Sequence, residues 1–267
     1  TIEGNGGCLL FNVTSAALSL SNLSLNHGNG TMGGAIAGDL ANVTCNNCQF
    51  FGNRASATGG AISVMRSNVS FDGETVCRRN SAGLEGGCVA ATEGSLLAFA
   101  GKSTFDENVA SSDGGAVYVH ESEAVFTGSN YFYNNTAGDS GGAVLAFDGT
   151  LAFFGDRSSA VFFNNTAVLL FGGALSFEGK LSMTLEVESC VFANNRAPTG
   201  GAVYLAGRAS DSVISGVRFR SNSATLNGGA MVLSRPGAGV QDGKSNALEM
   251  INCTFEDNTA GRDGGAV

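Results

Sequence analysis

Three kinds of side chain in this sequence could do chemistry: seven cysteines, two histidines and acidic residues that recur near glycine pairs. Paired cysteines form disulfides or hold zinc. Histidine is a common general base, and paired carboxylates cleave glycosidic bonds. Which chemistry is available depends on which of these residues the fold brings together. The elements that position them must therefore be worked out first.

The chain repeats one unit of about 27 residues, which predicts a solenoid. Gly-Gly pairs recur 26 to 36 residues apart, beginning at Gly6, Gly33, Gly59, Gly86, Gly114, Gly141, Gly172, Gly200, Gly228 and Gly264. Asparagines follow the same period, each three residues after an apolar residue that is usually Phe. This F-x-x-N register opens with Leu23 and Asn26, and Cys77 also replaces Phe in it.

Within one unit, short segments such as 60–64, 69–71 and 75–77 mix apolar and polar residues in near alternation. They predict three strands per unit, separated by Gly, Asn and Asp turns. No segment has a sustained helical period. We therefore predict an all-β fold, a parallel β-helix with one coil per repeat, roughly nine to ten coils and a length of about 45 Å. We interpret residues 1–267 as a single β-helix domain and a segment of a longer chain.

In stacked coils each residue lies above its counterpart, so the repeated residues are expected to form structural ladders. The phenylalanines should make a buried column of rings, and the asparagines should bond from coil to coil at a corner, where Asn tolerates a left-handed backbone. The glycine pairs supply positive φ, and no phosphate-binding glycine motif is present. The expected ladder residues are Phe50, Phe105, Phe132, Phe162, Phe192, Phe219, Phe255, Asn53, Asn80, Asn108, Asn135, Asn165, Asn195, Asn222 and Asn258.

The combination of GGA[IVL] with F-x-x-N resembles the repeats of the chlamydial polymorphic outer membrane proteins. Similar repeats occur in secreted algal, oomycete and protist proteins. The first motif stands as GGAI at Gly33 and Gly59, GGAV at Gly114, Gly141, Gly200 and Gly264, and GGAL at Gly172. The resemblance covers essentially the whole chain, although Cys8 and Cys88 replace the usual Ala. It implies a right-handed parallel β-helix with a surface-exposed adhesive or structural role, as in an autotransporter passenger.

The position of each cysteine within the repeat indicates which pairs can form a disulfide. Cys77 and Cys88 point inward on adjoining sides of one coil and are the first choice for a disulfide, and Cys45 with Cys48 or Cys8 comes next. Cys190 and Cys253 are separated by an intervening coil, about 9 to 10 Å, which is too far for a bridge. The spacing Cys45-x-x-Cys48 also suits zinc. No second such pair or paired His completes four ligands, so no metal is predicted.

Eight N-x-[ST] sequons are candidates for N-glycosylation in a secreted eukaryotic protein. Strand parity predicts that Asn22 and Asn252 point outward. The candidates are Asn12, Asn22, Asn29, Asn42, Asn68, Asn134, Asn164 and Asn252.

No catalytic residue and no cofactor are predicted. The motifs of pectin-type hydrolases are absent, and His27 and His120 are expected to be surface residues. The acids near the turns are Asp106, Glu107, Asp113, Glu256, Asp257 and Asp263. Asp106 and Asp257 could share one face, but many coils apart, too far for a carboxylate pair.

Two irregularities indicate contact sites. The interval from Gly228 to Gly264 is the longest, and its insertion, residues 234–244, is expected to form a surface loop. The apolar run Leu169 to Phe171 occupies a turn that is polar elsewhere, and it is a candidate contact with another chain.

The net charge of −9 and the lack of a basic cluster argue against nucleic acid, and no apolar run is long enough to span a membrane. We predict a non-enzymatic, extracellular or cell-surface structural or adhesive rod that is a filament building block. Its expected partners are proteins or further copies bound through the β-helix ends or side faces, with glycans as a further ligand class. The alternative is a carbohydrate-binding or polysaccharide-degrading β-helix protein.

Overall fold

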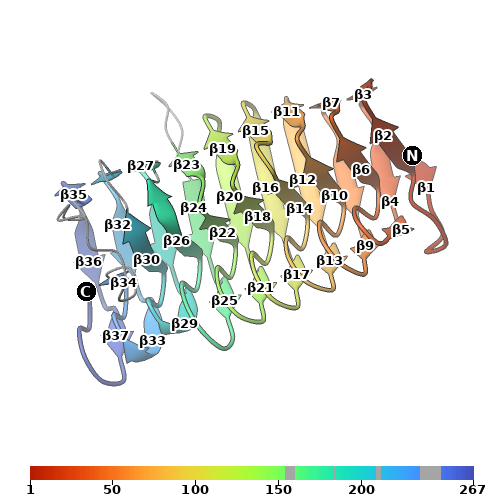
Figure 1. The fold of residues 1–267 in the computed structure, drawn as a ribbon. Coiled ribbons are helices and arrows are strands. Elements are labelled where there is room, and N and C mark those ends of the chain that lie inside the picture. The colour runs from red at the N-terminus through yellow and green to blue at the C-terminus, as the bar shows by residue number, and fades with distance from the viewer. Residues whose placement is uncertain (154–159, 183, 209–211, 235–247) are drawn as a thin grey trace.

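The chain winds into a rod of stacked coils (Figure 1). The computed structural model describes residues 1–267 except 154–159, 183, 209–211 and 235–247. Each coil contributes one strand to each of four sheets, and every strand pairs in parallel with its counterpart one coil away. Within the described residues, one sheet has ten strands and the other three have nine. The predicted parallel β-helix is confirmed.

Sheet A contains the F-x-x-N phenylalanines and sheet B follows the glycine pairs. Sheet A consists of β1 (Ile2–Glu3), β4 (Ser24–Asn26), β8 (Gln49–Phe51), β12 (Glu74–Arg78), β16 (Lys102–Asp106), β20 (Asn130–Tyr133), β24 (Ala160–Phe163), β28 (Val191–Ala193), β32 (Arg218–Arg220) and β36 (Thr254–Glu256). Sheet B consists of β2 (Phe11–Thr14), β6 (Ile36–Asp39), β10 (Ile62–Met65), β14 (Val89–Thr92), β18 (Val117–His120), β22 (Val144–Phe147), β26 (Leu175–Ser182), β30 (Val203–Arg208) and β34 (Met231–Ser234).

Sheets C and D complete each coil. Sheet C consists of β3 (Ala17–Ser21), β7 (Asn42–Asn46), β11 (Asn68–Asp72), β15 (Leu96–Phe99), β19 (Glu123–Phe126), β23 (Thr150–Phe153), β27 (Thr184–Glu188), β31 (Ser212–Ser215) and β35 (Leu248–Ile251). Sheet D consists of β5 (Asn29–Gly30), β9 (Arg54–Ala55), β13 (Ser81–Ala82), β17 (Val109–Ala110), β21 (Thr136–Ala137), β25 (Thr166–Ala167), β29 (Arg196–Thr199), β33 (Ser223–Asn227) and β37 (Thr259–Ala260).

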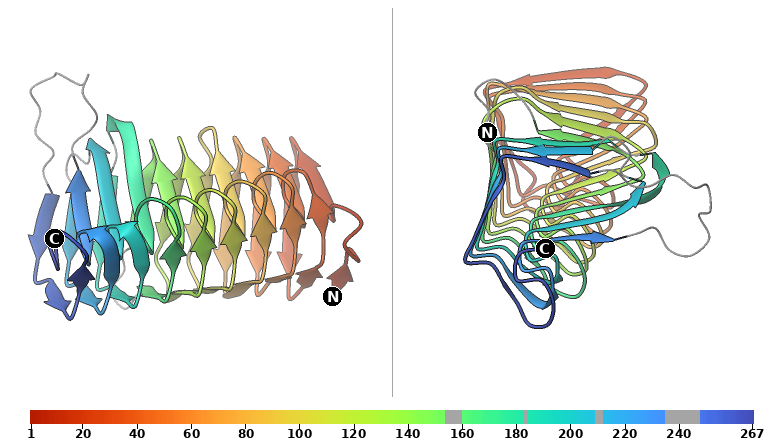
Figure 2. Two further views of the ribbon diagram at one scale, coloured as in Figure 1. Left: turned by 90° about the horizontal axis from the view of Figure 1, so that it is seen from below. Right: turned by 90° about the vertical axis from the view of Figure 1, so that its left-hand side faces the viewer.

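The chain passes through the sheets in the order B, C, A, D, and successive coils repeat nearly the same outline, each displaced from the last (Figure 2). The prediction of three strands per coil was wrong, because the short strands of sheet D form a fourth. Most of them have only two residues, such as Thr136 and Ala137, and are too short to show alternation. A search for a membrane-crossing helix finds none in the described residues.

The F-x-x-N phenylalanines form the predicted column inside sheet A. Phe132 stacks between Phe105 and Phe162, with ring centroids 4.7 and 4.6 Å away, and the rings are nearly parallel. The stack continues through Phe192 and Phe219 to Phe255. In-register pairing of parallel strands dictates this arrangement, since equivalent side chains must lie one strand spacing apart.

A second aromatic column, which the sequence analysis missed, lies inside sheet C. Phe71, Phe99, Phe126 and Phe153 stack at centroid distances of 4.4 to 4.5 Å. Their rings contact the first column edge to face, as Phe126 does against Phe132 at 5.7 Å. The two columns together fill the interior of the central coils with offset and T-shaped pairs.

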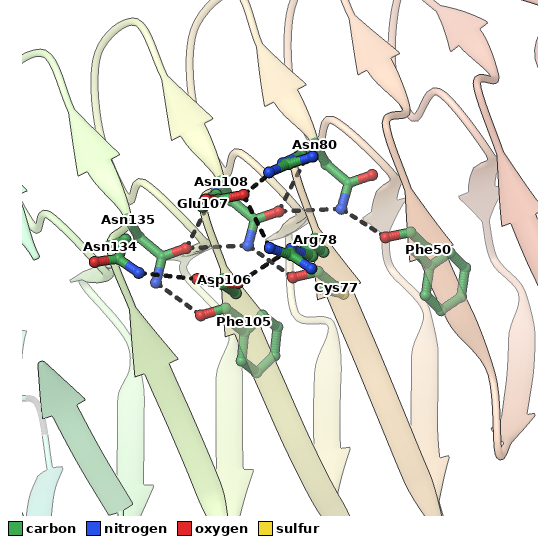
Figure 3. Close-up of polar contacts among 11 residues, drawn as sticks. Phe50, Cys77, Arg78, Asn80, Phe105, Asp106, Glu107, Asn108, Asn134 and Asn135 are labelled. Carbon is green, nitrogen blue, oxygen red and sulfur yellow. Dashed lines mark hydrogen bonds and ion pairs between the residues drawn. The ribbon is translucent and has the colours of Figure 1, made fainter.

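The asparagine ladder runs along the corner between sheets A and D (Figure 3). The Asn108 side chain donates to Asn135 Oδ1 of the next coil (3.0 Å) and to the Cys77 carbonyl of the coil before (3.0 Å). The Asn108 backbone N–H also donates to Asn135 Oδ1 (3.1 Å). The same pattern extends from Asn53 to Asn258, so the amides satisfy backbone groups at a buried corner.

Two details of the ladder differ from expectation. The left-handed residue is the one before the ladder asparagine, as at Asn134 (φ 55°) before Asn135. The first coil is also shifted by two residues, because Leu25 pairs with Phe50 and Leu23 does not. Gly28 therefore occupies the ladder register in place of Asn26, and its N–H donates to Asn53 Oδ1 (2.9 Å).

Each glycine pair performs two tasks. The first glycine has positive φ, as at Gly114 (61°). The second packs against sheet D of the next coil, since a Cβ at Gly115 would lie 2.7 Å from the carbonyl carbon of Thr136. Both positions exclude a side chain, which explains why the pair repeats.

Cys77 and Cys88, the first-choice pair, form a disulfide with Cα atoms 6.2 Å apart, and both are fully buried. Cys77 lies in the sheet A column between Phe50 and Phe105, and Cys88 takes the place of Ala after a glycine pair. Cys190 and Cys253 are free, with Val217 of the intervening coil between them.

Cys45 and Cys48, named as the second candidate pair, are also free and buried. The Cys48 thiol donates to the Leu20 and Asn46 carbonyls (3.6 and 3.5 Å). The hydrogen bond with Cys48, together with burial, raises the pKa of the Cys45 thiol. Cys8 is exposed and is also free.

We expect the double variant Cys77→Ala/Cys88→Ala to lose about 2–3 kcal/mol of unfolding free energy, because the disulfide closes a short loop in the unfolded chain. Cys77→Phe/Cys88→Ala restores the consensus residues and should recover much of this loss by completing the ring stack. Urea denaturation of the three proteins measures both effects. Equal stability of the two variants would show that the column does not accept a ring at position 77.

Candidate binding surface

Both histidines lie on the outside of the rod, as expected. His27 is exposed, with Nδ1 3.0 Å from Glu3 Oε2, and His120 is half-buried on the outer face of sheet B. Asp106 and Asp257 do not share a row, because Glu256 takes the register of Asp106.

All eight sequon asparagines are exposed, in contrast to the buried ladder asparagines from Asn53 to Asn222. Glycan occupancy stays a prediction.

The residues immediately before the glycine pairs stack in one register beside the outer face of sheet B. Gly86 N–H donates to the Asp113 carbonyl (2.9 Å), so the turn of Glu85 lies directly on the turn of Asp113. Their carboxylates therefore project from turns about 4.8 Å apart. Tyr118 follows Asp113 into β18 and lies beside both acids.

Burial and like charge raise the pKa of these groups. Burial raises the pKa of Asp113, and Asp139 adds to it, while a hydrogen bond from the Ser140 N–H (2.9 Å) opposes the shift. Burial and then Asp113 raise the pKa of Glu85. Burial, Glu85 and Asp113 raise the pKa of Tyr118 to about 12. The surface therefore concentrates negative charge where water is partly excluded.

Aromatic rings continue this surface across sheet B. His120 lies 6.3 Å from Tyr118 and makes an edge contact with Phe147 at 5.5 Å, measured between ring centroids. Beyond the strand ends, Glu121, Glu123 and Asp148 line a shallow depression at the corner with sheet C. We call the outer surface of β14, β18 and β22 with its flanking turns the sheet B surface. Acids that accept hydrogen bonds, next to aromatic rings, suit ligands rich in hydroxyl groups or positive charge.

A metal centre is not formed by these acids. In the parts of the chain that the structure describes, no three His, Cys, Asp or Glu side chains are grouped so as to hold a metal ion.

Comparison with known families agrees with this architecture. The family model described as the right handed beta helix region matches residues 86–265. The chain belongs to the right-handed β-helix family. A Chlamydia polymorphic membrane protein repeat matches residues 47–64, which run from β8 into β10 of this β-helix. No curated protein and no solved structure gives a match.

The two family matches indicate the handedness of the β-helix and the cellular location of proteins with similar repeats. The β-helix is right-handed, as the family is, and the expected resemblance to the chlamydial repeats is confirmed. The polymorphic membrane proteins are outer membrane surface proteins, whereas the right-handed β-helix family also includes enzymes.

Asp113 and His120 were recognisable as candidates in the sequence, whereas Glu85 and Tyr118 were not. The signal for Glu85 was present, since it precedes a glycine pair just as Asp113 and Asp263 do.

The apolar run Leu169 to Phe171 is exposed at Leu169 (64%), while Phe171 stacks on Tyr204 with centroids 4.1 Å apart. Its contact with another chain stays a prediction. The predicted insertion loop lies almost entirely outside the described residues.

We expect Asp113→Asn to raise the urea midpoint at about pH 7 and to leave it unchanged at about pH 3. A carboxyl with a raised folded pKa stabilises the fold when protonated, and this stability is lost as pH rises through the folded pKa. The amide removes that loss and can still accept from Ser140. Asp263→Asn, at the exposed equivalent position, is the control. A gain of equal size at both pH values would contradict the electrostatic explanation.

Proposed function

We propose that this β-helix is a non-enzymatic, extracellular or cell-surface rod that serves as a structural or adhesive element through its lateral faces. One contrast carries the proposal. The positions that repeat from coil to coil are buried in the ladders, whereas partly exposed outward positions change chemistry at each coil, as from Thr92 to His120 to Phe147 on sheet B. A constant scaffold with variable faces suits recognition of partners.

Two further observations support a location outside the cytosol. The Cys77–Cys88 disulfide is typical of proteins from oxidising compartments. The matched repeat comes from proteins of an outer membrane surface. The expected partners are proteins or glycans, and the sheet B surface is the first candidate contact.

The test has a localisation arm and a binding arm. Protease treatment of intact source cells should remove the protein, and the purified rod should bind members of a panel of glycans and extracellular proteins. Tyr118→Ala/His120→Ala should weaken this binding, while Arg196→Ala on sheet D should not. Protection from protease on intact cells, or binding unaffected by the double variant, would contradict the proposal.

A second candidate is a carbohydrate-active enzyme, which the Glu85 and Asp113 pair favours. Two carboxyl groups with raised pKa, on turns about 4.8 Å apart, suit acid–base cleavage of a glycosidic bond. Release of reducing ends from a polysaccharide panel by the native protein, lost in both Glu85→Gln and Asp113→Asn, would establish this function. Binding without turnover would favour the rod.

A further inference from the structure

On the last seven strands of sheet A, the outer face carries a row of side chains in which charges of opposite sign lie at equal distances on either side of Phe163. This stretch takes one outward residue from each of seven successive strands of sheet A, from β12 to β36, and the row continues beyond Arg78 with Phe51, Asn26 and Glu3. In order along the rod the seven residues are Arg78, Asp106, Tyr133, Phe163, Ala193, Arg220 and Glu256.

The centre of the row is apolar and accessible. Phe163 is 40% exposed and meets Tyr133 in an edge contact at 6.5 Å. The neighbouring outward row adds Tyr131, Val161 and Val191 on the same three strands, all partly exposed. The rings and methyl groups form one patch over β20, β24 and β28.

The charges lie at equal distances on either side of Phe163. Two strands away stand Asp106 on one side and Arg220 on the other. Three strands away stand Arg78 and Glu256. Asp106 and Arg78 form an ion pair with each other (3.1 Å), whereas Arg220 and Glu256 have no ion-pair partner in the described residues.

We propose that this face binds a second copy of the same chain, with the two rods antiparallel and related by a two-fold axis that runs along β24 over Phe163. Such an axis keeps each row opposite itself and reverses the order of the coils. Asp106 then faces Arg220 of the second copy, and Arg78 faces Glu256 of the second copy. Each contact occurs twice, as in any isologous interface.

The next register agrees with this arrangement. Arg79 and Asp257 follow Arg78 and Glu256 at the corner, and the same axis brings Arg79 opposite Asp257 of the second copy. At the centre, Phe163 meets its own counterpart, Tyr133 meets Ala193, and Tyr131 meets Val191. Apolar residues thus meet apolar residues, surrounded by opposite charges.

The parallel arrangement of two rods is disfavoured by the same residues. A two-fold axis along the rod would keep equal coils opposite each other and would exchange the two rows. Arg218 of one copy would then face Arg220 of the other, twice, with no acid between them. The charge pattern therefore selects the antiparallel dimer.

The size of the face predicts a reversible, salt-sensitive dimer. Seven strands span about 29 Å along the rod, so the interface is at the lower end of the range for stable complexes. Its ion pairs lie near the rim and weaken as salt screens them. Asn134, Asn164 and Asn252 border the face, so glycans at these sequons and the dimer exclude each other.

A charge-exchange experiment tests the proposal on protein made without N-glycans in a compartment that forms disulfides. Sedimentation equilibrium of the native chain should show a monomer–dimer equilibrium that weakens at high salt. Arg220→Glu and Asp106→Arg should each raise the dimer dissociation constant at least about 100-fold, because each places like charges opposite each other twice. An equimolar mixture of the two variants should dimerise again, since both contacts are then complementary.

Arg196→Glu, an exposed charge on sheet D, is the matched control and should leave the equilibrium unchanged. Phe163→Lys, which disturbs neither Asp106 nor Arg220, should also give monomers, and circular dichroism checks that each variant folds. A native chain that stays monomeric at its solubility limit would overturn the proposal. So would a dimer insensitive to Arg220→Glu and Phe163→Lys, or a mixture that stays monomeric.

Discussion

Replacing Asn135 with alanine is expected to cost about 3–6 kcal/mol of unfolding free energy. Asn135 Oδ1 accepts from the backbone N–H and the side-chain amide of Asn108 (3.1 and 3.0 Å). Its own amide donates to the Phe105 carbonyl and to Asn165 Oδ1 (both 3.0 Å). Alanine leaves two donors of Asn108 without partners and removes one donor from the Phe105 carbonyl, at a fully buried corner where water cannot replace the lost bonds.

The neighbouring asparagine is the matched control. Asn134 is exposed and has φ 55°, and its bonds to Asp106 and Asn164 lie at the surface. Asn134→Gly should change stability by less than about 0.5 kcal/mol, because glycine tolerates this backbone and Gly52 already occupies the equivalent position. Urea denaturation of unglycosylated protein gives both values. Similar losses for Asn135→Ala and Asn134→Gly would refute the role of the ladder.

The sequence predicted the fold because stacking converts a period in the chain into a column in space. The phenylalanine and asparagine registers repeat every 27 or so residues, and parallel pairing in register places equivalent residues on one another. The same reasoning should have found the second aromatic column, since Phe71, Phe99, Phe126 and Phe153 recur at intervals of 28, 27 and 27. It also should have found the corner where Ser67, Ser95 and Ser122 accept backbone N–H groups of preceding coils.

Other features of the structure could not be inferred from the repeat period of the sequence. The strands of sheet D are too short to show alternation, and the first coil deviates by two residues, which displaced Leu23 from its assumed register. The outward residues do not repeat, so no period links Glu85 with Tyr118 or Asp106 with Arg220. Which outward residues lie side by side depends on the number of coils between them and on the path of each turn, and only the folded chain defines these. The candidate surfaces therefore required the structure, although the scaffold did not.

Phe132→Ala tests the packing of the core and is expected to cost about 3–5 kcal/mol. Phe132 is fully buried, stacks on Phe105 and Phe162, and touches the second column at Phe126 and Phe153. Alanine removes one ring from four pairs and leaves a cavity that the rigid strand spacing cannot close. In a solenoid each coil contacts only its neighbours, so the damage should be local.

Hydrogen exchange can distinguish this local effect from global destabilisation. In Phe132→Ala, amide protection should fall most in β16, β20 and β24 and remain close to native in β4 and β36. Phe163→Ala is the control, since its ring is 40% exposed on the opposite face of β24, and it should cost about 1 kcal/mol or less. Low protein concentration keeps self-association out of the comparison. A uniform loss of protection along the rod would show that the coils unfold as one cooperative unit, because the ring stack would then transmit the defect to both ends.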